Sequence, residues 1–343
     1  MGAVQDRHWL SVLVPVHNVA PYLRACVESV LQQADAGVEV VLRDDCSTDG
    51  SADLMQQLNA EHGGRLRLLQ AERNLGISGT RNALLEASRG EWIWFLDSDD
   101  FLMPGAIPAL RQCVQAEALD LVLCDFRDVR EQRSLKHRLR REQHRRTHTL
   151  PARQPCSDRS ALMSGLFLQG HMHVWSKIAR RRLWGDDLRF PVGRYFEDMA
   201  LAPHLLLRAR SALYVPEVWV GYRKRPGSIM ASISAHKVDD MQDALNGLAD
   251  ALRAAQPPLR QEALLAAAHF VAKTYVAASQ FAARGQDPTR LARYLQQFER
   301  NAPASAAALL RFYASKAWFW RALRLRHWIQ RGRKAATQSP PLA

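Results

Sequence analysis

The sequence predicts an α/β protein in which helices flank a mostly parallel β-sheet, with a helical extension at the C-terminal end. Two observations indicate this class. Short apolar runs alternate with amphipathic stretches over the first ~125 residues, which is typical of βαβ repeats. From about residue 235 the chain is rich in Ala and Leu, and this composition favours helices.

The strands and helices can be placed in order along the chain. Strands are predicted at residues 10–16, 38–42, 66–69, 92–96 and 119–123. The first helix follows from apolar residues at helical spacing, namely Leu23, Val27, Val30 and Leu31, and further helices are predicted at residues 52–58, 80–87 and 107–114. Because helices separate the strands, the strands should run parallel, and their carboxyl ends should meet at one edge of the sheet.

Composition and charge narrow the class of protein. The 343 residues, 47% of them hydrophobic, are enough for two domains or for one large domain with an appendage. Five scattered cysteines without paired spacing favour reduced thiols and a cytoplasmic protein. The first apolar run is broken by Pro15, so we expect a buried strand rather than a signal peptide, and no segment approaches the ~20 apolar residues that span a bilayer. The net charge of +13 predicts an anionic partner, which could be a nucleotide, a nucleic acid or a membrane surface.

Two further clusters have a simple interpretation. Residues 131–148 are strongly basic, and such a run is typical of a solvated surface insertion. His171 and His173 could ligate a metal, but without a third ligand they favour a polar surface or an acceptor site.

Three carboxylates, Asp97, Asp99 and Asp100, follow the apolar run at residues 92–96. Their mutual repulsion predicts a counter-ion, and the spacing of Asp97 and Asp99 suits a divalent cation that also binds phosphate oxygens and water. At neighbouring strand ends, Asp45 could accept hydrogen bonds from a base or ribose, and Arg81 could face a diphosphate. The alternative for each loop is that its polar residues are turn formers and helix caps.

Six segments together resemble the nucleotide-sugar glycosyltransferases of family 2, which are cytoplasmic and have the GT-A fold, a Rossmann-like sheet flanked by helices. The similarity covers residues 9 to 230 and lies in SVLVPVHN, RDDCSTDGS, NLGISGTRN, FLDSDD, FEDMALAPHLL and YRKRPGSI. It implies inverting transfer of a sugar from a nucleoside diphosphate, with Mn²⁺ or Mg²⁺ as cofactor.

The resemblance assigns roles to residues of this chain. Those implied to bind the donor nucleotide are Pro15, His17, Asn18, Asp45, Asn74, Gly76, Arg81, Asp97 and Ser98. Asp45 matches the carboxylate that contacts uracil. Asp99 matches the direct metal ligand, and Asp97 lies on the ribose or in the metal shell.

The second half of the resemblance concerns the acceptor. Asp198, in the pair Glu197-Asp198, matches the general base, although an acidic pair at a helix start is also a favourable interaction with the helix dipole. Six residues match segments on the acceptor or diphosphate side, with core packing as the alternative: Trp175, Lys177, Tyr222, Arg223, Arg225 and Ser228.

The C-terminal tail, residues 316–334, interleaves aromatic and aliphatic residues with Lys and Arg. This composition suits a helix at the surface of an anionic membrane, and equally a terminal helix that packs its apolar stripe on the domain. The sequence leaves both alternatives open.

These observations predict three regions: a nucleotide-sugar-binding half at residues 1–130, an acceptor-binding half with the general base at 131–234, and a helical extension at 235–343. The resemblance implies a reaction that moves a sugar, of UDP-hexose type, to a hydroxyl of a bacterial cell-surface glycan or lipid-linked precursor. The expected location is the cytoplasm, with peripheral contact to the inner face of the membrane, and no nucleic acid is expected as partner. The alternatives are a nucleotidyltransferase on a similar fold, a nucleic-acid-binding protein using the basic insertion and tail, and an inactive scaffold.

Overall fold

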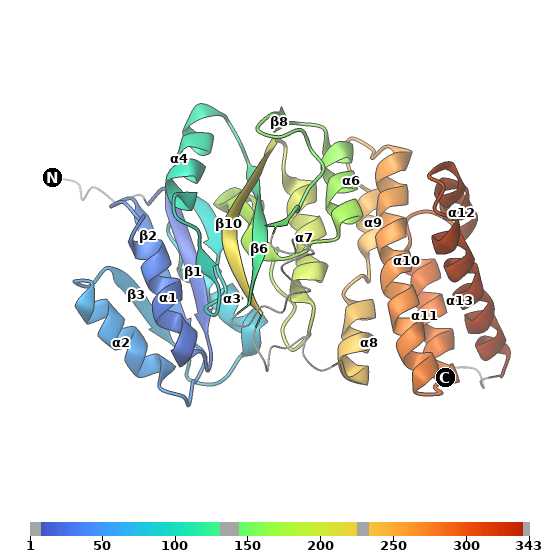
Figure 1. The fold of residues 1–343 in the computed structure, drawn as a ribbon, viewed down its shortest axis with the longest axis horizontal. Coiled ribbons are helices and arrows are strands. Elements are labelled where there is room, and N and C mark those ends of the chain that lie inside the picture. Colours follow the sequence, from blue (N-terminus) through green and yellow to red (C-terminus); the bar gives the residue numbers. More distant parts are fainter. Residues whose placement is uncertain (1–7, 131–143, 225–232, 339–343) are drawn as a thin grey trace. The chain divides into compact units, whose positions relative to one another are not determined.

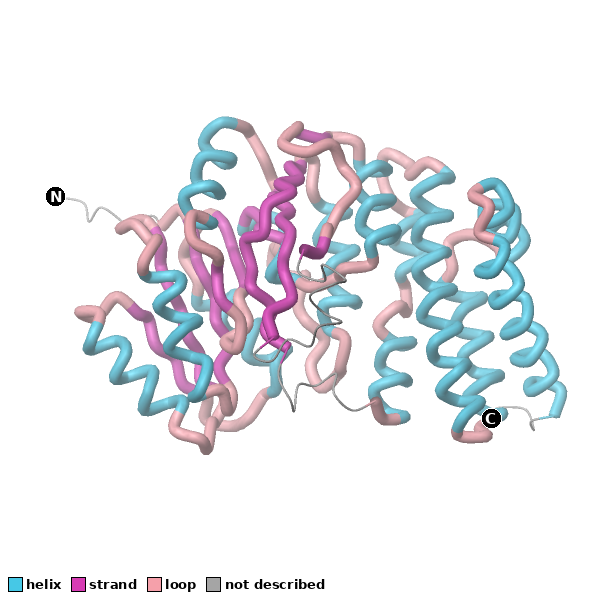
Figure 2. Tube along the Cα trace, viewed as in Figure 1, coloured by secondary structure: helices cyan, strands magenta, loops and turns pink. Residues whose placement is uncertain are grey.

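The structure, a computed structural model, describes residues 8–130, 144–224 and 233–338 (Figure 1). The chain divides into two compact units. The first comprises Met1–Ser157, His173–Arg194 and Arg208–Ser228, and it contains the β-sheet. The second comprises Asp158–Met172, Tyr195–Leu207 and Ile229–Ala343, and its described elements are helices. Figure 2 shows the strands of the first unit in magenta and the helices of the second unit in cyan.

One sheet organises the first unit, with strand order β3-β2-β1-β4-β9-β6-β10-β5. Its main strands are β1 (Leu10–Val16), β2 (Val38–Asp44), β3 (Leu66–Gln70), β4 (Trp92–Phe95), β5 (Phe101–Leu102), β6 (Leu121–Arg130), β9 (Lys177–Arg180) and β10 (Ala212–Lys224). Two short strands lie beside this path, β7 (His144–Arg145) on β6 and β8 (Pro155–Cys156) on β10. Strands β3, β2, β1 and β4 run parallel to one another.

Helices cover the sheet, and β1 is therefore buried along its whole length. One side of β1 shares a core with α1 (Ala20–Leu31), α2 (Ser51–Glu61) and α4 (Ala106–Ala116). On β4, Phe95 instead makes edge-to-face contacts with Trp184 and Phe190 at 5.3 Å. Helix α3 (Gly76–Ala87) packs against β1 and β2. Each fully buried large apolar side chain stabilises such a core by roughly 1.5–3 kcal/mol.

The predicted α/β class with a helix-flanked sheet is confirmed, and strands occur at all five predicted places. The sheet is mostly parallel, as predicted, but β9 lies between β4 and β6 and pairs antiparallel with both. The fifth strand begins at Leu121 and continues to Arg130, well beyond its predicted end at residue 123. The sequence did not predict β10, which runs parallel to β6 over most of its length.

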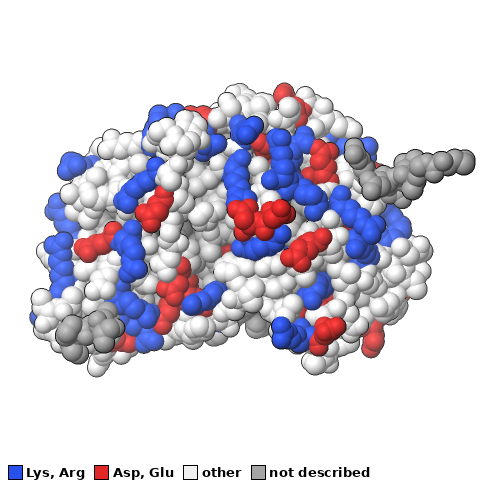
Figure 3. Space-filling view, turned by 180° about the vertical axis from the view of Figure 1, so that it is seen from behind, with Lys and Arg blue, Asp and Glu red and all other residues white. Residues whose placement is uncertain are grey.

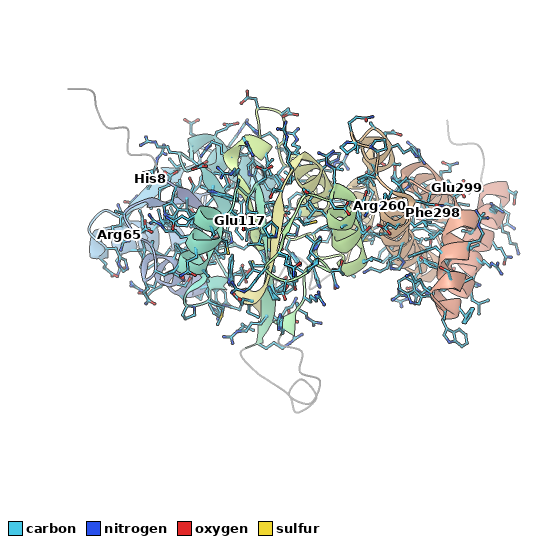
Figure 4. All side chains as sticks on the ribbon, turned by 90° about the horizontal axis from the view of Figure 1, so that it is seen from above. His8, Arg65, Glu117, Arg260, Phe298 and Glu299 are labelled. Carbon is cyan, nitrogen blue, oxygen red and sulfur yellow. The ribbon has the colours of Figure 1, made fainter. Side chains whose placement is uncertain are left out.

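The second unit is a group of helices centred on α10 (Gln261–Arg284). The others are α6 (Arg159–Gln169), α7 (Glu197–Arg208), α8 (Ala235–Asp243), α9 (Leu248–Arg253), α11 (Pro288–Asn301), α12 (Ala306–Ser315) and α13 (Phe319–Gln338). Helix α10 packs against α6, α8, α11, α12 and α13. Tyr275 on α10 stacks on Phe298 of α11 at 4.9 Å, and Figure 4 labels Phe298. The predicted C-terminal helices are therefore confirmed.

Side-chain caps explain where several of these helices begin. The carboxylate of Asp287 accepts the backbone N–H of Arg290 at the start of α11, and the Ser305 hydroxyl accepts that of Ala308 at the start of α12. Such caps satisfy amides that have no partner within the helix, typically contributing about 1 kcal/mol. Within the described ranges, no helix combines the length and apolarity needed to cross a bilayer.

The structure describes only the end of the basic insertion, because residues 131–143 lie outside the described residues. His144 Nε2 lies 2.7 Å from Asp125 Oδ2 on β6, and the Thr147 backbone N–H donates to Asp125 Oδ1 at 2.7 Å. Arg145 donates two hydrogen bonds to Asp128, at 2.7 and 3.0 Å. The insertion therefore returns to the sheet through polar contacts with two largely buried carboxylates of β6.

Candidate active site

Four loops at the carboxyl edge of the parallel strands carry the predicted donor residues. His17 and Asn18 follow β1, Asp45 follows β2, Asn74 lies between β3 and α3, and Asp97 follows β4. The register of β1 with β2 and β4, and of β2 with β3, places these strand ends side by side. Parallel strands bring their following loops to a common edge, where α/β proteins bind ligands.

Asp45 is the buried centre of this edge, with an exposed fraction of 2%. Its two carboxylate oxygens accept the backbone N–H groups of Leu75 at 2.9 Å and Gly76 at 2.8 Å, which begin α3. Gly76 has φ of +70°, a conformation that residues with a Cβ rarely adopt. Asp45 therefore locks the loop after β2 to the start of α3, and its contact with a nucleobase stays a prediction.

Above Asp45, three exposed side chains form a connected rim: His17, Asn18 and Asn74. His17 Nδ1 lies 2.9 Å from the Asp45 carbonyl oxygen, which also accepts from Asn74 Nδ2 at 3.1 Å. A carbonyl can only accept, so this contact favours the tautomer with the proton on Nδ1. Asn18 Nδ2 lies 3.3 Å from His17 Nε2, and Asn18 Oδ1 accepts the Thr48 N–H at 2.8 Å. The rim is thus both exposed and held in position.

Pro15 and Ser98, also predicted as donor contacts, do not join this rim. Pro15 lies within β1 and is buried, and Ser98 has an exposed fraction of 5%. Both side chains are thus largely shielded from solvent, and their contact with the donor stays a prediction.

Arg81 is a counter-ion of the acidic segment. Its guanidinium Nη2 lies 2.7 Å from Asp97 Oδ1, and the side chains have exposed fractions of 3% and 28%. The guanidinium also lies 5.3 Å from the ring centroid of Phe190, within reach of a cation–π interaction. The buried Arg81 side chain thus links helix α3 to the loop after β4. Its predicted contact with a diphosphate stays a prediction.

The remaining carboxylates of the segment are organised by Arg223 on β10. Its Nε donates to the Asp99 carbonyl at 2.9 Å, and its backbone N–H donates to Asp100 Oδ1 at 2.8 Å. Asp100 is fully buried, and this burial, reinforced by the charges of Asp97 and Asp99, raises its pKa well above the usual value. The charge repulsion is therefore relieved by Arg81 and by the shift of Asp100 toward its neutral form. The sequence places Asp100 in the acidic run but does not show its burial.

An aromatic cluster lies behind this segment. Trp175 has an exposed fraction of 1%, and its ring stacks on His173 at 4.7 Å and meets Phe126 edge-on at 4.8 Å. Tyr222 lies 5.7 Å from Trp175 and is partly buried. The Lys177 ammonium is buried and donates to the His173 carbonyl at 2.8 Å. For Trp175 and Lys177 the geometry favours packing over ligand contact.

Among the other acceptor-side candidates, Tyr222 and Arg223 are partly exposed. The Arg223 guanidinium lies 5.1 Å from the ring of Tyr22 and 5.5 Å from that of Phe101. Arg225 and Ser228 lie outside the described residues. Of the described candidates on the acceptor side, Tyr222 and Arg223 are thus the two that are accessible to a ligand.

Glu197 and Asp198 open α7 in the second unit, and both are partly exposed. The preceding residue, Phe196, has φ of +61°, which is uncommon for a residue with a Cβ. Its carbonyl accepts the N–H groups of Met199 at 3.0 Å and Ala200 at 3.2 Å, so the sharp turn leads directly into the helix. An acidic pair in a first helical turn interacts favourably with the dipole. A helix start also holds a carboxylate rigidly, as a general base requires.

The described residues include no group of three or more His, Cys, Asp or Glu side chains arranged to hold a metal ion. Asp97 and Asp99 are therefore at most a two-carboxylate site. Mg²⁺ and Mn²⁺ suit such a site when substrate phosphates and water supply the other ligands. The residues fit a cation that binds together with a nucleotide better than one held by protein alone.

Comparison with known proteins places the chain in a family. Residues 11–174 match the family model "Glycosyl transferase family 2". The succinoglycan biosynthesis protein ExoO of Rhizobium meliloti is 30% identical over 265 residues, and the match covers 71% of this chain and 71% of ExoO. The glycosyltransferases GlyG and GlyA of Streptococcus pneumoniae are 29% and 26% identical over 64% of this chain, and the matches span 72% of GlyG and 31% of GlyA.

Solved structures share the fold. TarS 1–349 of Staphylococcus aureus, solved with UDP-GlcNAc, superposes with a TM-score of 0.69 at 20% identity, covering 97% of this chain and 93% of that one. The mannosyltransferase PcManGT of Pyrobaculum calidifontis, solved with GDP-Man and Mn²⁺, gives 0.53 at 19% identity, covering 95% and 87%. The family match, the relatives and the fold agree with the motifs at the sheet edge: the chain is a glycosyltransferase and belongs to glycosyl transferase family 2.

Proposed function

We propose that this protein transfers a hexose-type sugar, with inversion, from a UDP-sugar to a hydroxyl of a bacterial cell-surface glycan or of its lipid-linked precursor. Residues 1–130 bind the nucleotide sugar, 131–234 supply the acceptor side and the general base, and 235–343 form the helical extension. We assign the reaction to the cytoplasm. Family membership argues against the nucleotidyltransferase, nucleic-acid-binding and scaffold alternatives as the main activity.

One observation carries the donor half of the proposal: the exposed rim of His17, Asn18 and Asn74 lies on the same sheet edge as Asp97 and Asp99. The rim offers an imidazole and two amides, which suit the edges of a nucleobase and the ribose hydroxyls. The acidic pair suits a cation bound to a diphosphate. A nucleoside diphosphate presents both chemistries in one molecule, so it matches the edge as a whole.

The acceptor half rests on Asp198. In the proposed reaction the acceptor oxygen forms a bond to the anomeric carbon while the bond from that carbon to the diphosphate breaks. The hydroxyl proton passes to the Asp198 carboxylate, and the electron pair of the broken bond leaves with the diphosphate. Asp198 suits this role because the turn at Phe196 and the start of α7 fix its backbone.

Asp99, with Asp97 beside it, would hold the divalent cation. When bound, such a cation supplies Lewis-acid stabilisation to the charge on the departing diphosphate. Arg81 orients Asp97 through their 2.7 Å contact. Because the pKa of Asp100 is raised, the segment of Asp97, Asp99 and Asp100 carries less negative charge than it would with all three carboxylates ionised. The protein thereby limits repulsion toward the incoming diphosphate.

The choice of substrates is supported by the relatives. TarS was solved with UDP-GlcNAc, which favours UDP as the donor nucleotide, and PcManGT was solved with GDP-Man and Mn²⁺, which supports a divalent metal. ExoO is a succinoglycan biosynthesis protein and TuaG of Bacillus subtilis a putative teichuronic acid biosynthesis glycosyltransferase. Both names support a cell-surface polysaccharide as the product.

The test is thermal unfolding of the full chain with UDP, GDP, CDP and their sugars, each with and without Mn²⁺. A ligand at 100 times its Kd stabilises the native state by about 2.7 kcal/mol. A metal-dependent shift selective for UDP compounds is expected. A shift selective for GDP would mean that the donor is a GDP-sugar rather than a UDP-sugar. The absence of a shift with any nucleotide, together with a shift on adding RNA or DNA, would overturn the proposal.

A further inference from the structure

The first turn of α13 exposes three large apolar side chains. Phe319, Trp320 and Leu323 have exposed fractions of 61%, 84% and 54%. The other exposed large hydrophobic residues of the described ranges, Leu168, Val192 and Ile233, are far apart in the sequence. At positions i, i+1 and i+4 of a helix, Phe319, Trp320 and Leu323 share one side of α13. We call this cluster the apolar turn.

The rest of α13 is firmly packed, so the apolar turn is not simply a loose end. Leu325, Trp328 and Ile329 are buried on the opposite side of the helix, which packs against α10, α11 and α12. The Tyr275 hydroxyl on α10 donates to the Trp328 carbonyl at 2.9 Å. The packing alternative for the tail therefore holds for one face of α13, and a second face of the same helix points to solvent.

The sequence around and after the apolar turn is rich in cations. Glu299, labelled in Figure 4, is the last acidic residue of the chain. After it the described residues carry cations that are all exposed: Arg300, Arg311, Lys316, Arg321, Arg324, Arg326, Arg331, Arg333 and Lys334. In Figure 3, Lys and Arg line the left-hand edge, where the C-terminal helices lie. A surface that combines exposed Trp, Phe and Leu with many exposed cations, of which Arg333 lies 4.0 Å from Glu299, complements anionic lipid headgroups.

We propose that α13 docks this face on the surface of an anionic lipid bilayer. The apolar turn enters the headgroup region, with Trp320, the most exposed of the three, at its centre. Lys316 and Arg324 flank the turn in sequence and contact lipid phosphates. A protein partner fits less well, because stable protein interfaces bury about 1,600 Å² and three side chains supply only a small part of that area.

This inference depends on the packing and charge of α13 and not on the transfer reaction. It would place the enzyme beside a lipid-linked acceptor. The two proposals can nevertheless fail separately, because vesicle binding and nucleotide binding are measured in different assays.

The experiment is flotation of the full chain with two kinds of vesicle. One is phosphatidylcholine alone, and the other also contains about 30 mol% phosphatidylglycerol, which is anionic. The wild-type chain is expected to float with the anionic vesicles only, and less at high salt. Substituting Phe319→Ser, Trp320→Ser and Leu323→Ser together should weaken partitioning at least ~10-fold. Charge reversal of Lys316, Arg324 and Arg331 to Glu should weaken it further than neutral substitution would.

Matched controls are charge reversals of Arg89, Arg210 and Arg284 to Glu, which change the net charge equally at exposed positions outside α13. These controls should float nearly as the wild type does. If the wild type fails to float with anionic vesicles, or if both α13 variants float as it does, the proposal is wrong. A concentration-dependent dimer that the serine variant abolishes, without vesicle binding, would assign the face to self-association instead.

Discussion

The Asp240 carboxylate on α8 accepts a hydrogen bond from the backbone N–H of Tyr195, at 3.0 Å, two residues before Glu197. Asp240 has an exposed fraction of 1%, and His236 lies 3.5 Å from its Oδ2. The bond anchors the segment in which Phe196 takes its φ of +61° and α7 begins. Asp240 is therefore a positioning residue for the proposed base, and no sequence motif marks it.

Replacing Asp240 should slow transfer without weakening donor binding. The variant Asp240→Ala leaves the Tyr195 N–H without its acceptor, which costs about 1–3 kcal/mol, so the turn at Phe196 can relax. We expect kcat to fall about 10-fold or more with an unchanged Kd for UDP. Asp240→Asn keeps an acceptor oxygen and should retain more activity. Equal loss of nucleotide binding in both variants would show a general structural role.

Removing Arg81 should destabilise the donor edge. Arg81→Met leaves Asp97 beside Asp99 and Asp100 without its cation, and we expect a loss of about 1–3 kcal/mol in unfolding free energy, less than for a fully buried pair. Urea unfolding measures this. The control is Arg24→Gln, which breaks the exposed pair of Arg24 with Glu61 and should leave the unfolding midpoint nearly unchanged. An Arg81 variant as stable as this control would contradict the counter-ion role.

Asp99 and Asp198 should fail in different ways. Asp99→Asn is expected to weaken Mn²⁺-dependent nucleotide binding at least ~10-fold, because the proposed metal site loses a charged ligand. Asp198→Asn should leave nucleotide binding intact and lower kcat by ~10²-fold or more, because it removes the proton acceptor. Titration calorimetry with UDP and a transfer assay separate the two. A normal kcat in Asp198→Asn would move the base elsewhere.

His269, on α10, should make the helical unit sensitive to acid. Burial, aided by the charges of Arg321 and Lys273, lowers its pKa to about 4, and its Nδ1 lies 2.9 Å from the Tyr313 hydroxyl. The native state binds this proton less readily than the unfolded chain, whose histidine titrates near 6.5, so its contribution to stability is intact above pH ~6.5 and falls progressively toward pH ~4. The loss should reach about 3 kcal/mol.

Thermal or urea unfolding between pH 7 and 4 tests this expectation. His269→Gln should flatten the pH dependence relative to the wild type. His327→Gln, at an exposed position on α13, is the matched control and should keep the wild-type slope. If the His269 and His327 variants give the same pH profile, the buried histidine does not titrate as the structure indicates.

The parallel half of the sheet was predictable, because β1 to β4 are short, mainly apolar runs separated by amphipathic segments. Strand β10 was not, because Pro216 and Glu217 interrupt its apolar run. The structure accommodates them with register irregularities between Val215 and Val218, which let the strand continue to Lys224. Local pattern cannot show that a neighbouring strand will tolerate such a break.

In the candidate site, too, the positions of the residues could be predicted from the sequence, but their contacts could not. The sequence places His17, Asn18, Asp45, Asn74 and Asp97 at strand ends, and the fold brings them to one edge. Their partners could not be read from the motifs, because tertiary packing decides that Asp45 accepts the amides of α3 and that Arg81 reaches Asp97. For the same reason, Lys177 reads as a candidate ligand in sequence, although its ammonium is bound to a backbone carbonyl in the interior.

The chain passes between its two compact units five times, because three segments of each alternate along the sequence. A single cut therefore cannot release either unit as an independent piece. Truncation near residue 234 would strip α6 of α10, including the contact of Phe167 with Phe270 at 5.8 Å. Helices α6 and α7 are encoded among the strands but belong with the C-terminal helices. A chimera that combines one unit of this enzyme with the other unit of a relative would therefore need several coordinated crossovers rather than one.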